Sequence, residues 1–155
     1  MKLLTILLTL LLLPVSATFG QAIDETVVYG GLKYDQNAYV SASGVGFKMG
    51  KGLWGFVSAG PANDGAEAAL EAVYFIDKGR FSFGSILGPN FDWVDYPTDS
   101  LNPVMYFLGA VGTIVAYELT DDIGVWAAVK QKWTFGDNSY NPNTQLGGGL
   151  YLKVW

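Results

Sequence analysis

The sequence predicts an all-β fold, an eight-stranded antiparallel up-and-down transmembrane β-barrel, and three observations lead to this prediction. Turn signals divide the chain after residue 22 into eight segments of strand length. The connections between these segments alternate in length, with short turns at one end and longer loops at the other. Where the alternation of residue types is clear, charged residues share one face of a segment and apolar residues share the other.

Residues 1–22 have the features of a cleaved secretory signal peptide. Lys2 precedes a short apolar run, and small residues then form two candidate cleavage sites that end at Ala17 and Ala22. The run is too short for a spanning helix, which needs roughly 20 apolar residues; a short N-terminal anchor is the alternative. We therefore expect an exported chain in which residues 23–155 form one barrel domain.

The composition argues against several classes of function. The 155 residues include no histidine and no cysteine, so imidazole chemistry, histidine-ligated metals and disulfides are all absent. Without Lys2 the exported chain has eight basic and fourteen acidic residues, whereas proteins that bind nucleic acids need a basic face. Half of the residues are apolar and 20 are glycine, as in barrels whose outer face meets lipid. We expect no enzymatic activity, no cofactor, no metal and no nucleic-acid partner.

The turn signals also give the bounds of the expected strands. These cover residues 25–34, 38–49, 52–60, 66–77, 79–88, 104–119, 122–136 and 145–155. The short connections are 49–52, 77–80 and 119–122, and the longer ones are 34–38, 60–65, 88–103 and 136–145. An even number of strands places both chain ends at the short-turn end of the barrel. The second and third strands alternate poorly, so their inward faces stay undetermined.

Two lysines orient the strand at 122–136. Lys130 and Lys132 share its even face, and a lysine that faces lipid at mid-membrane costs about 2–4 kcal/mol, so the even residues should point inward. Similar reasoning predicts an interior polar network of Glu67, Glu71, Arg80, Glu118, Lys130 and Lys132, with Lys33 and Lys48 as further members. We expect these side chains to fill the narrow interior as paired charges. A narrow ion path and a proton-handling pair of Glu67 and Glu71 are the alternatives.

Two of the expected strands also fit helices. Glu67 and Glu71 stand four residues apart in the alanine-rich segment 66–77, which is a helical spacing, but this segment leads into a tight hairpin. Segment 104–117 is apolar on both faces, yet it is shorter than a spanning helix and contains two glycines. We predict strands at both places, and a helical membrane protein built on 104–117 is the alternative.

The longest connection combines aromatic and acidic residues. Its candidate contact residues are Phe91, Asp92, Trp93, Asp95, Tyr96 and Asp99. The four longer connections hold six aspartates and no lysine or arginine. Such loops suit contact with a glycan or a protein, and their carboxylates can share divalent cations with lipopolysaccharide. The alternative is a solvated loop whose aromatic residues lie at the membrane interface.

The end of the sequence, GGGLYLKVW (147–155), resembles the C-terminal assembly signal of outer-membrane barrel proteins. Trp155 matches the terminal aromatic residue of that signal and Tyr151 matches an apolar or aromatic position further back, whereas Lys153 stands where the family usually has an apolar or aromatic residue. The stretch GAVGTIVAYELTDDIGVW (109–126) resembles the hairpins of small OmpA/OmpX-type barrels. The sequence is thus similar to small eight-stranded outer-membrane β-barrel proteins.

This resemblance implies an integral barrel in a Gram-negative-type outer membrane, whose narrow interior leaves no channel wide enough for solutes. Such a fold does not by itself give a function, so we predict a structural or surface-interaction role from the acidic and aromatic loops. Its expected partners are outer-membrane lipid and lipopolysaccharide, the barrel-assembly machinery, and a surface protein or glycan ligand. The rival is a soluble secreted lipocalin-like barrel that binds a small apolar ligand, and it requires apolar residues inside and charged residues outside.

Overall fold

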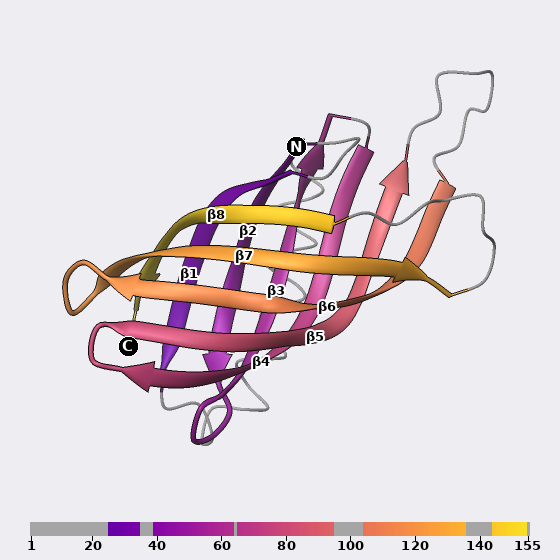
Figure 1. Cartoon of the computed structure of the whole chain (residues 1–155). Coiled ribbons are helices and arrows are strands. Elements are labelled where there is room, and N and C mark those ends of the chain that lie inside the picture. Colours follow the sequence, from indigo (N-terminus) through magenta and orange to yellow (C-terminus); the bar gives the residue numbers. More distant parts are fainter. Residues whose placement is uncertain (1–24, 35–38, 64, 95–103, 136–143, 155) are drawn as a thin grey trace, which may run out of the picture.

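The computed structural model describes residues 25–34, 39–63, 65–94, 104–135 and 144–154. These residues form eight antiparallel strands that close into a barrel, in which each strand pairs with its neighbours in the sequence and β1 pairs with β8 (Figure 1). The strands are β1 (Thr26–Tyr34), β2 (Tyr39–Lys48), β3 (Leu53–Ala62), β4 (Gly65–Lys78), β5 (Phe81–Val94), β6 (Val104–Glu118), β7 (Ile123–Thr134) and β8 (Thr144–Lys153). The predicted up-and-down barrel is confirmed.

The two segments that also fitted helices are strands. Segment 66–77 lies in β4 and segment 104–117 lies in β6. No helix in the described part of the chain is long and apolar enough to cross a membrane. The predicted signal peptide, residues 1–22, and the terminal Trp155 lie outside the described residues.

Side chains alternate between an apolar outer face and a charged interior. On β7, Lys130 and Lys132 are 4% and 2% exposed, whereas Val129, which directly precedes them, is 47% exposed. On β8, Gln145 is buried and Leu150 is exposed. This confirms the register predicted from the two lysines, and it is the reverse of the arrangement that a soluble lipocalin-like barrel requires.

Aromatic residues on the outer face gather near both ends of the barrel. At the short-turn end the rings of Phe81 and Tyr117 have centroids 4.6 Å apart. At the long-loop end Phe107 lies between Phe91 and Phe135, with centroids 5.3 and 5.5 Å away. Phe81 and Phe91 are ten residues apart on β5, which corresponds to roughly 25 Å of height for a strand rise of about 3.3 Å and a tilt of about 40°. Outer-membrane barrels have an apolar band of about this height between two aromatic girdles.

The predicted alternation of loop lengths is only partly right. The connections 95–103 and 135–143 are long, but β3 and β4 are separated only by residues 63 and 64, where a longer loop at 60–65 was expected. β5 continues to Val94, six residues beyond its predicted end at residue 88. The strands on this side of the barrel therefore reach further than the turn signals suggested.

Both errors trace to Gly-Pro pairs that lie within strands. The β2–β3 pairing skips Gly60 and Pro61, and the β4–β5 pairing skips Gly88 and Pro89, because proline has no N–H with which to complete the ladder. The glycine before each proline lies against the backbone of the preceding strand: a Cβ on Gly88 would be 2.1 Å from the carbonyl oxygen of Leu70 on β4. A Gly-Pro pair here marks an interruption of one ladder, and the strand continues through it.

The barrel interior as the candidate functional site

The barrel interior has two parts that differ in chemistry. Near the long loops it holds a group of buried polar side chains, which we call the charge cluster: Lys33, Glu67, Glu71, Asp92, Lys130, Lys132 and Gln145. Near the short turns it holds a cavity of about 260 Å³, which we call the vestibule. The two parts meet at Glu71, Lys33 and Lys130, which also line the cavity.

Glu67 is the centre of the charge cluster. Its Oε1 atom accepts a hydrogen bond from Lys33 Nζ at 2.7 Å, and its Oε2 atom accepts bonds from Lys132 Nζ at 2.5 Å and from the Gln145 amide at 2.7 Å. Lys132 Nζ also lies 3.1 Å from Asp92 Oδ2. These residues come from β1, β4, β5, β7 and β8, so one connected set of bonds crosses the barrel.

A second ion pair lies next to the centre of the cluster. Lys130 Nζ is 2.5 Å from Glu71 Oε1, and 4% and 9% of the two side chains are exposed. With this pair the cluster has three lysines and three carboxylates, so it is electrically neutral as a whole. Such balance is needed because an unpaired charge in a dry interior costs several kcal/mol.

The strand register brings the cluster together. Glu67 and Asp92 are direct partners across β4 and β5, and Lys130 and Gln145 are direct partners across β7 and β8. On β8 the partner of Lys33 is Gly147. A Cβ at this glycine would already be 3.3 Å from Lys33 Cγ, so a larger residue would compete with the lysine for space.

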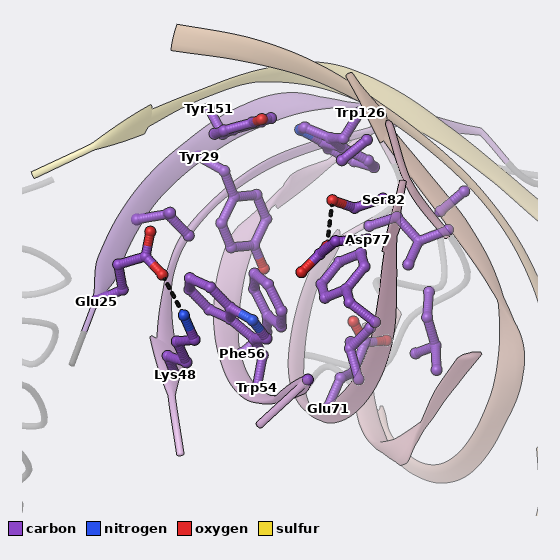
Figure 2. A pocket seen from close by; sticks show the side chains of 18 of the residues that line it. Glu25, Tyr29, Lys48, Trp54, Phe56, Glu71, Asp77, Ser82, Trp126 and Tyr151 are labelled. Carbon is purple, nitrogen blue, oxygen red and sulfur yellow. Dashed lines mark hydrogen bonds and ion pairs between the residues drawn. The ribbon is translucent and has the colours of Figure 1, made fainter. Parts of the chain in front are cut away.

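Aromatic side chains form much of the vestibule wall (Figure 2). They are Tyr29, Trp54, Phe56, Phe75, Trp126 and Tyr151. The Tyr29 ring meets Phe56 and Trp126 edge to face, with interplanar angles of 74° and 88° and centroid distances of 5.6 and 5.9 Å. Aromatic rings prefer such T-shaped contacts, so the wall is a packed set of rings and not a loose collection.

The mouth of the vestibule lies at the short-turn end and is ringed by paired polar groups. Lys48 Nζ lies 2.7 Å from Glu25 Oε2, and the Ser82 hydroxyl donates a hydrogen bond of 2.6 Å to Asp77; both contacts are drawn in Figure 2. Lys153 Nζ lies 2.5 Å from Glu118 Oε1. The cavity thus has a polar entrance, an aromatic middle and a charged floor.

The structure places the residues of the predicted interior network in three different environments. Glu67, Glu71, Lys130 and Lys132 are in the charge cluster. Glu118 faces the mouth of the vestibule and pairs with Lys153. Placing Arg80 inside was wrong: it lies in the turn between β4 and β5 with its side chain exposed, because the strand alternation ends at Lys78 and resumes at Phe81.

The predicted loop-contact residues are also divided. Asp92 is buried in the charge cluster and does not belong to a loop, which corrects that assignment. Phe91 and Trp93 are also strand residues and not loop residues: they lie on β5 with stacked rings whose centroids are 6.4 Å apart. The remaining three, Asp95, Tyr96 and Asp99, lie outside the described residues. Of the two assembly-signal residues, Tyr151 lines the vestibule and Trp155 is not described.

Sequence reasoning missed Gln145 and most of the vestibule. Continuing the alternation of β5 past Pro89 would have turned Asp92 inward, opposite Glu67, and this signal was present in the sequence. Trp126 was an exception on the inward face of its strand, and the structure shows that it points into the vestibule. In the described part of the chain no group of three or more acidic side chains is arranged to hold a metal ion.

Comparisons with known structures agree with this architecture. The N-terminal β-barrel domain of Pseudomonas aeruginosa OprF superimposes with a TM-score of 0.74 at 14% identity, over 86% of this chain and 100% of that domain. A de novo designed transmembrane β-barrel gives 0.60 at 17% identity, over 86% and 98% of the two chains. Neisserial surface protein A gives 0.58 at 14% identity, over 84% and 95%. The sequence matches no family model, and a search of curated proteins gives no match.

Strand number, connectivity and the apolar outer face together define the class of protein. The chain has the fold of the small eight-stranded outer-membrane β-barrels, and its outer face is that of a membrane barrel.

Proposed function

We propose that the protein is an integral outer-membrane barrel that acts through its surface and its loops, with an interior closed to solutes. The observation that carries this proposal is the charge cluster, which links five strands across the barrel with paired, buried side chains. A solute would have to break this set of bonds to pass. A structural or surface-interaction role therefore fits the geometry better than a pore.

The outer face supports the membrane part of the proposal. Leu87, Val111, Val129 and Leu150 are between 46% and 61% exposed on four different strands. Large exposed apolar surfaces are rare on monomeric proteins in water and mark contact with lipid or protein. A barrel satisfies its backbone hydrogen bonds by closure, as a spanning structure must.

The composition of the long loops supports a proposal about their contacts. The connections 95–103 and 136–143 contain Asp95, Tyr96, Asp99 and Asp137, and neither contains a lysine or arginine. We infer that these segments face the cell exterior and meet lipopolysaccharide through shared divalent cations, or a glycan or protein ligand. Assembly by the outer-membrane insertion machinery, through Tyr151 and Trp155, belongs to the same proposal. We expect no catalysis, since no histidine is available as a base.

The central test is a gel of outer-membrane fractions from cells that express the full chain. A closed barrel resists SDS until it is boiled, so we expect boiled and unboiled samples to migrate differently. Reconstituted vesicles should also fail to swell in isotonic arabinose, because the sugar cannot pass the charge cluster. Soluble protein without a gel shift would overturn the membrane assignment, and swelling would overturn the closed interior.

The loop contact needs a separate test with a matched control. Binding of the purified barrel to lipopolysaccharide in the presence of Ca²⁺ should weaken in the double variant Asp95→Asn/Asp99→Asn. Asp121→Asn, in the β6–β7 turn at the opposite end, should bind as the unchanged protein does. Equal binding by all three proteins would mean that the loop carboxylates do not contact lipopolysaccharide.

A further inference from the structure

The proposed function makes no use of the vestibule. Its volume of about 260 Å³ is close to the lower limit of small-molecule sites, which begin at about 300 Å³. Charged residues at the mouth and floor and aromatic residues between them give it the composition of a ligand pocket, with mostly apolar walls and a few polar groups.

The charges that line the vestibule argue for a neutral ligand. The lining contains four lysines and four carboxylates, and each of them has a partner within the protein: Lys33 with Glu67, Lys48 with Glu25, Lys130 with Glu71, Lys153 with Glu118, and Asp77 with Ser82. A charged ligand would have to break one of these pairs or stay unpaired in a poorly solvated site. Either outcome is unfavourable.

The shape of the wall argues for a ligand with an aromatic ring. Trp54 stacks on Phe56 with an interplanar angle of 22°, and Phe75 meets Trp54 at 88°. The wall therefore offers both faces and edges of rings, and another ring can take an offset-stacked or T-shaped position beside them. Such contacts contribute beyond the burial of apolar area, so they favour an aromatic over an aliphatic molecule of equal size.

The route into the vestibule is set by the closed barrel. Pairing between neighbouring strands continues around the whole circumference, including β1 with β8, so a lipid acyl chain cannot enter from the side. The charge cluster closes the long-loop end. A ligand must enter through the polar mouth at the short-turn end, from the aqueous side.

We propose that the vestibule binds a small neutral molecule built around one or two aromatic rings, which enters from the short-turn end. This goes beyond the proposed function, because a closed membrane barrel does not require an occupied interior. Tyr29, Phe56, Phe75 and Trp126 contact the ring, and the floor formed by Glu71 and Lys130 limits how deep the ligand reaches.

The test is a titration of the folded full-length barrel in lipid nanodiscs with indole, followed by NMR of valine and isoleucine methyl groups. The barrel supplies its own control for partitioning of indole into lipid. Methyl groups that line the vestibule belong to Val27, Val73, Ile86 and Ile114. Methyl groups on the outer face belong to Val111, Val115, Ile123 and Val129.

We expect saturable shifts of the vestibule methyl groups, with a Kd on the order of 1 mM for a ligand of this size, and small linear shifts of the outer ones. Ala128→Leu fills part of the vestibule and should weaken binding by about tenfold or more. Ala127→Leu, its neighbour on the outer face, should leave the Kd unchanged. Ala116→Leu fills the cavity from β6. It replaces Ala128→Leu as the test variant if Ala128→Leu does not give a heat-modifiable barrel.

Two results would overturn the proposal. Shifts that are equal and unsaturated on the inner and outer methyl groups would show partitioning into lipid only. Saturable binding that is unaffected by both vestibule variants would place the ligand elsewhere. Neither result touches the membrane assignment, which depends on heat modifiability and vesicle swelling.

Discussion

Lys132 and Glu67 form an ion pair across the inside of the barrel, with Lys132 Nζ 2.5 Å from Glu67 Oε2 and only 2% and 3% of the two side chains exposed. The residues are 65 positions apart in the sequence, on β7 and β4. Since Glu67 also binds Lys33 and Gln145, this one carboxylate connects three strands to β4. Many of the polar contacts in the long-loop end of the interior therefore depend on the Glu67 side chain.

The first prediction concerns the loss of this carboxylate. Glu67→Gln keeps the shape of the side chain but leaves Lys33 and Lys132 with one negative charge fewer between them. We expect the free energy of unfolding to fall by about 3–5 kcal/mol, the usual cost of breaking a buried pair from one side. Urea unfolding of the barrel from lipid vesicles, followed by tryptophan fluorescence, measures this change.

The matched control is Glu118→Gln at the mouth of the vestibule. Glu118 and Lys153 are 32% and 25% exposed, so water compensates the lysine when its partner is lost. We expect a loss below about 1 kcal/mol. Equal losses in the two variants would show that the charge cluster is no more important to stability than the pair at the mouth.

The second prediction tests how the outer face lies in lipid. Val129 is in the middle of β7 and faces outward, so Val129→Lys should cost about 2–4 kcal/mol. Phe135, just after the end of β7, is also exposed, and Phe135→Lys should cost about 0–1 kcal/mol because it lies near the interface. Folding titrations in vesicles provide both values, and a reversed order would mean that the membrane does not surround the middle of the barrel.

The third prediction concerns the interrupted ladder at Gly88 and Pro89. A Cβ at residue 88 would be 2.1 Å from the Leu70 carbonyl oxygen, so Gly88→Ala must push two strands apart. We expect a loss of about 1–3 kcal/mol, the range found for overpacked sites. Pro89→Ala restores an N–H without adding bulk and should change stability by less than about 0.5 kcal/mol. Similar unfolding curves for the two variants would contradict the close approach.

The fourth prediction concerns the orientation of the barrel in the membrane. The protein has no cysteine, so single cysteines can be introduced without background labelling. Asn63→Cys lies between β3 and β4 at the long-loop end, and Lys51→Cys lies between β2 and β3 at the short-turn end. In intact cells a membrane-impermeant maleimide should label Asn63→Cys and not Lys51→Cys. The opposite labelling pattern would mean that the barrel has the reverse orientation in the membrane, with the vestibule open to the cell exterior.

The strand faces could be predicted from the sequence because a misplaced charge in lipid is costly. Lys130 and Lys132 determined the register of β7, and Glu67 and Glu71 share the inward face of β4 as expected. In β2 and β3 small inward residues such as Ala42 and Ser58 give no comparable contrast. Their orientation becomes visible only from the pairing with neighbouring strands.

The partners within the interior could not be predicted in the same way. The pairing of each lysine with a carboxylate depends on the stagger between strands. Because Gly88–Pro89 was interpreted as a turn, Asp92 was predicted to lie in a loop and not in the interior. The vestibule was missed for a related reason. In a sequence, an aromatic residue that points into the barrel cannot be distinguished from one that faces lipid. Trp126, on the inward face of β7, therefore looked like an exception to the alternation of polar and apolar residues.

The division of the interior gives the barrel the form of a cup. Its base is the charge cluster beneath the long loops, and its rim is formed by the pairs Glu25–Lys48 and Glu118–Lys153 at the short turns. The charge cluster separates the vestibule from the long-loop end, so we expect substitutions in the long loops to leave ligand binding in the vestibule unchanged.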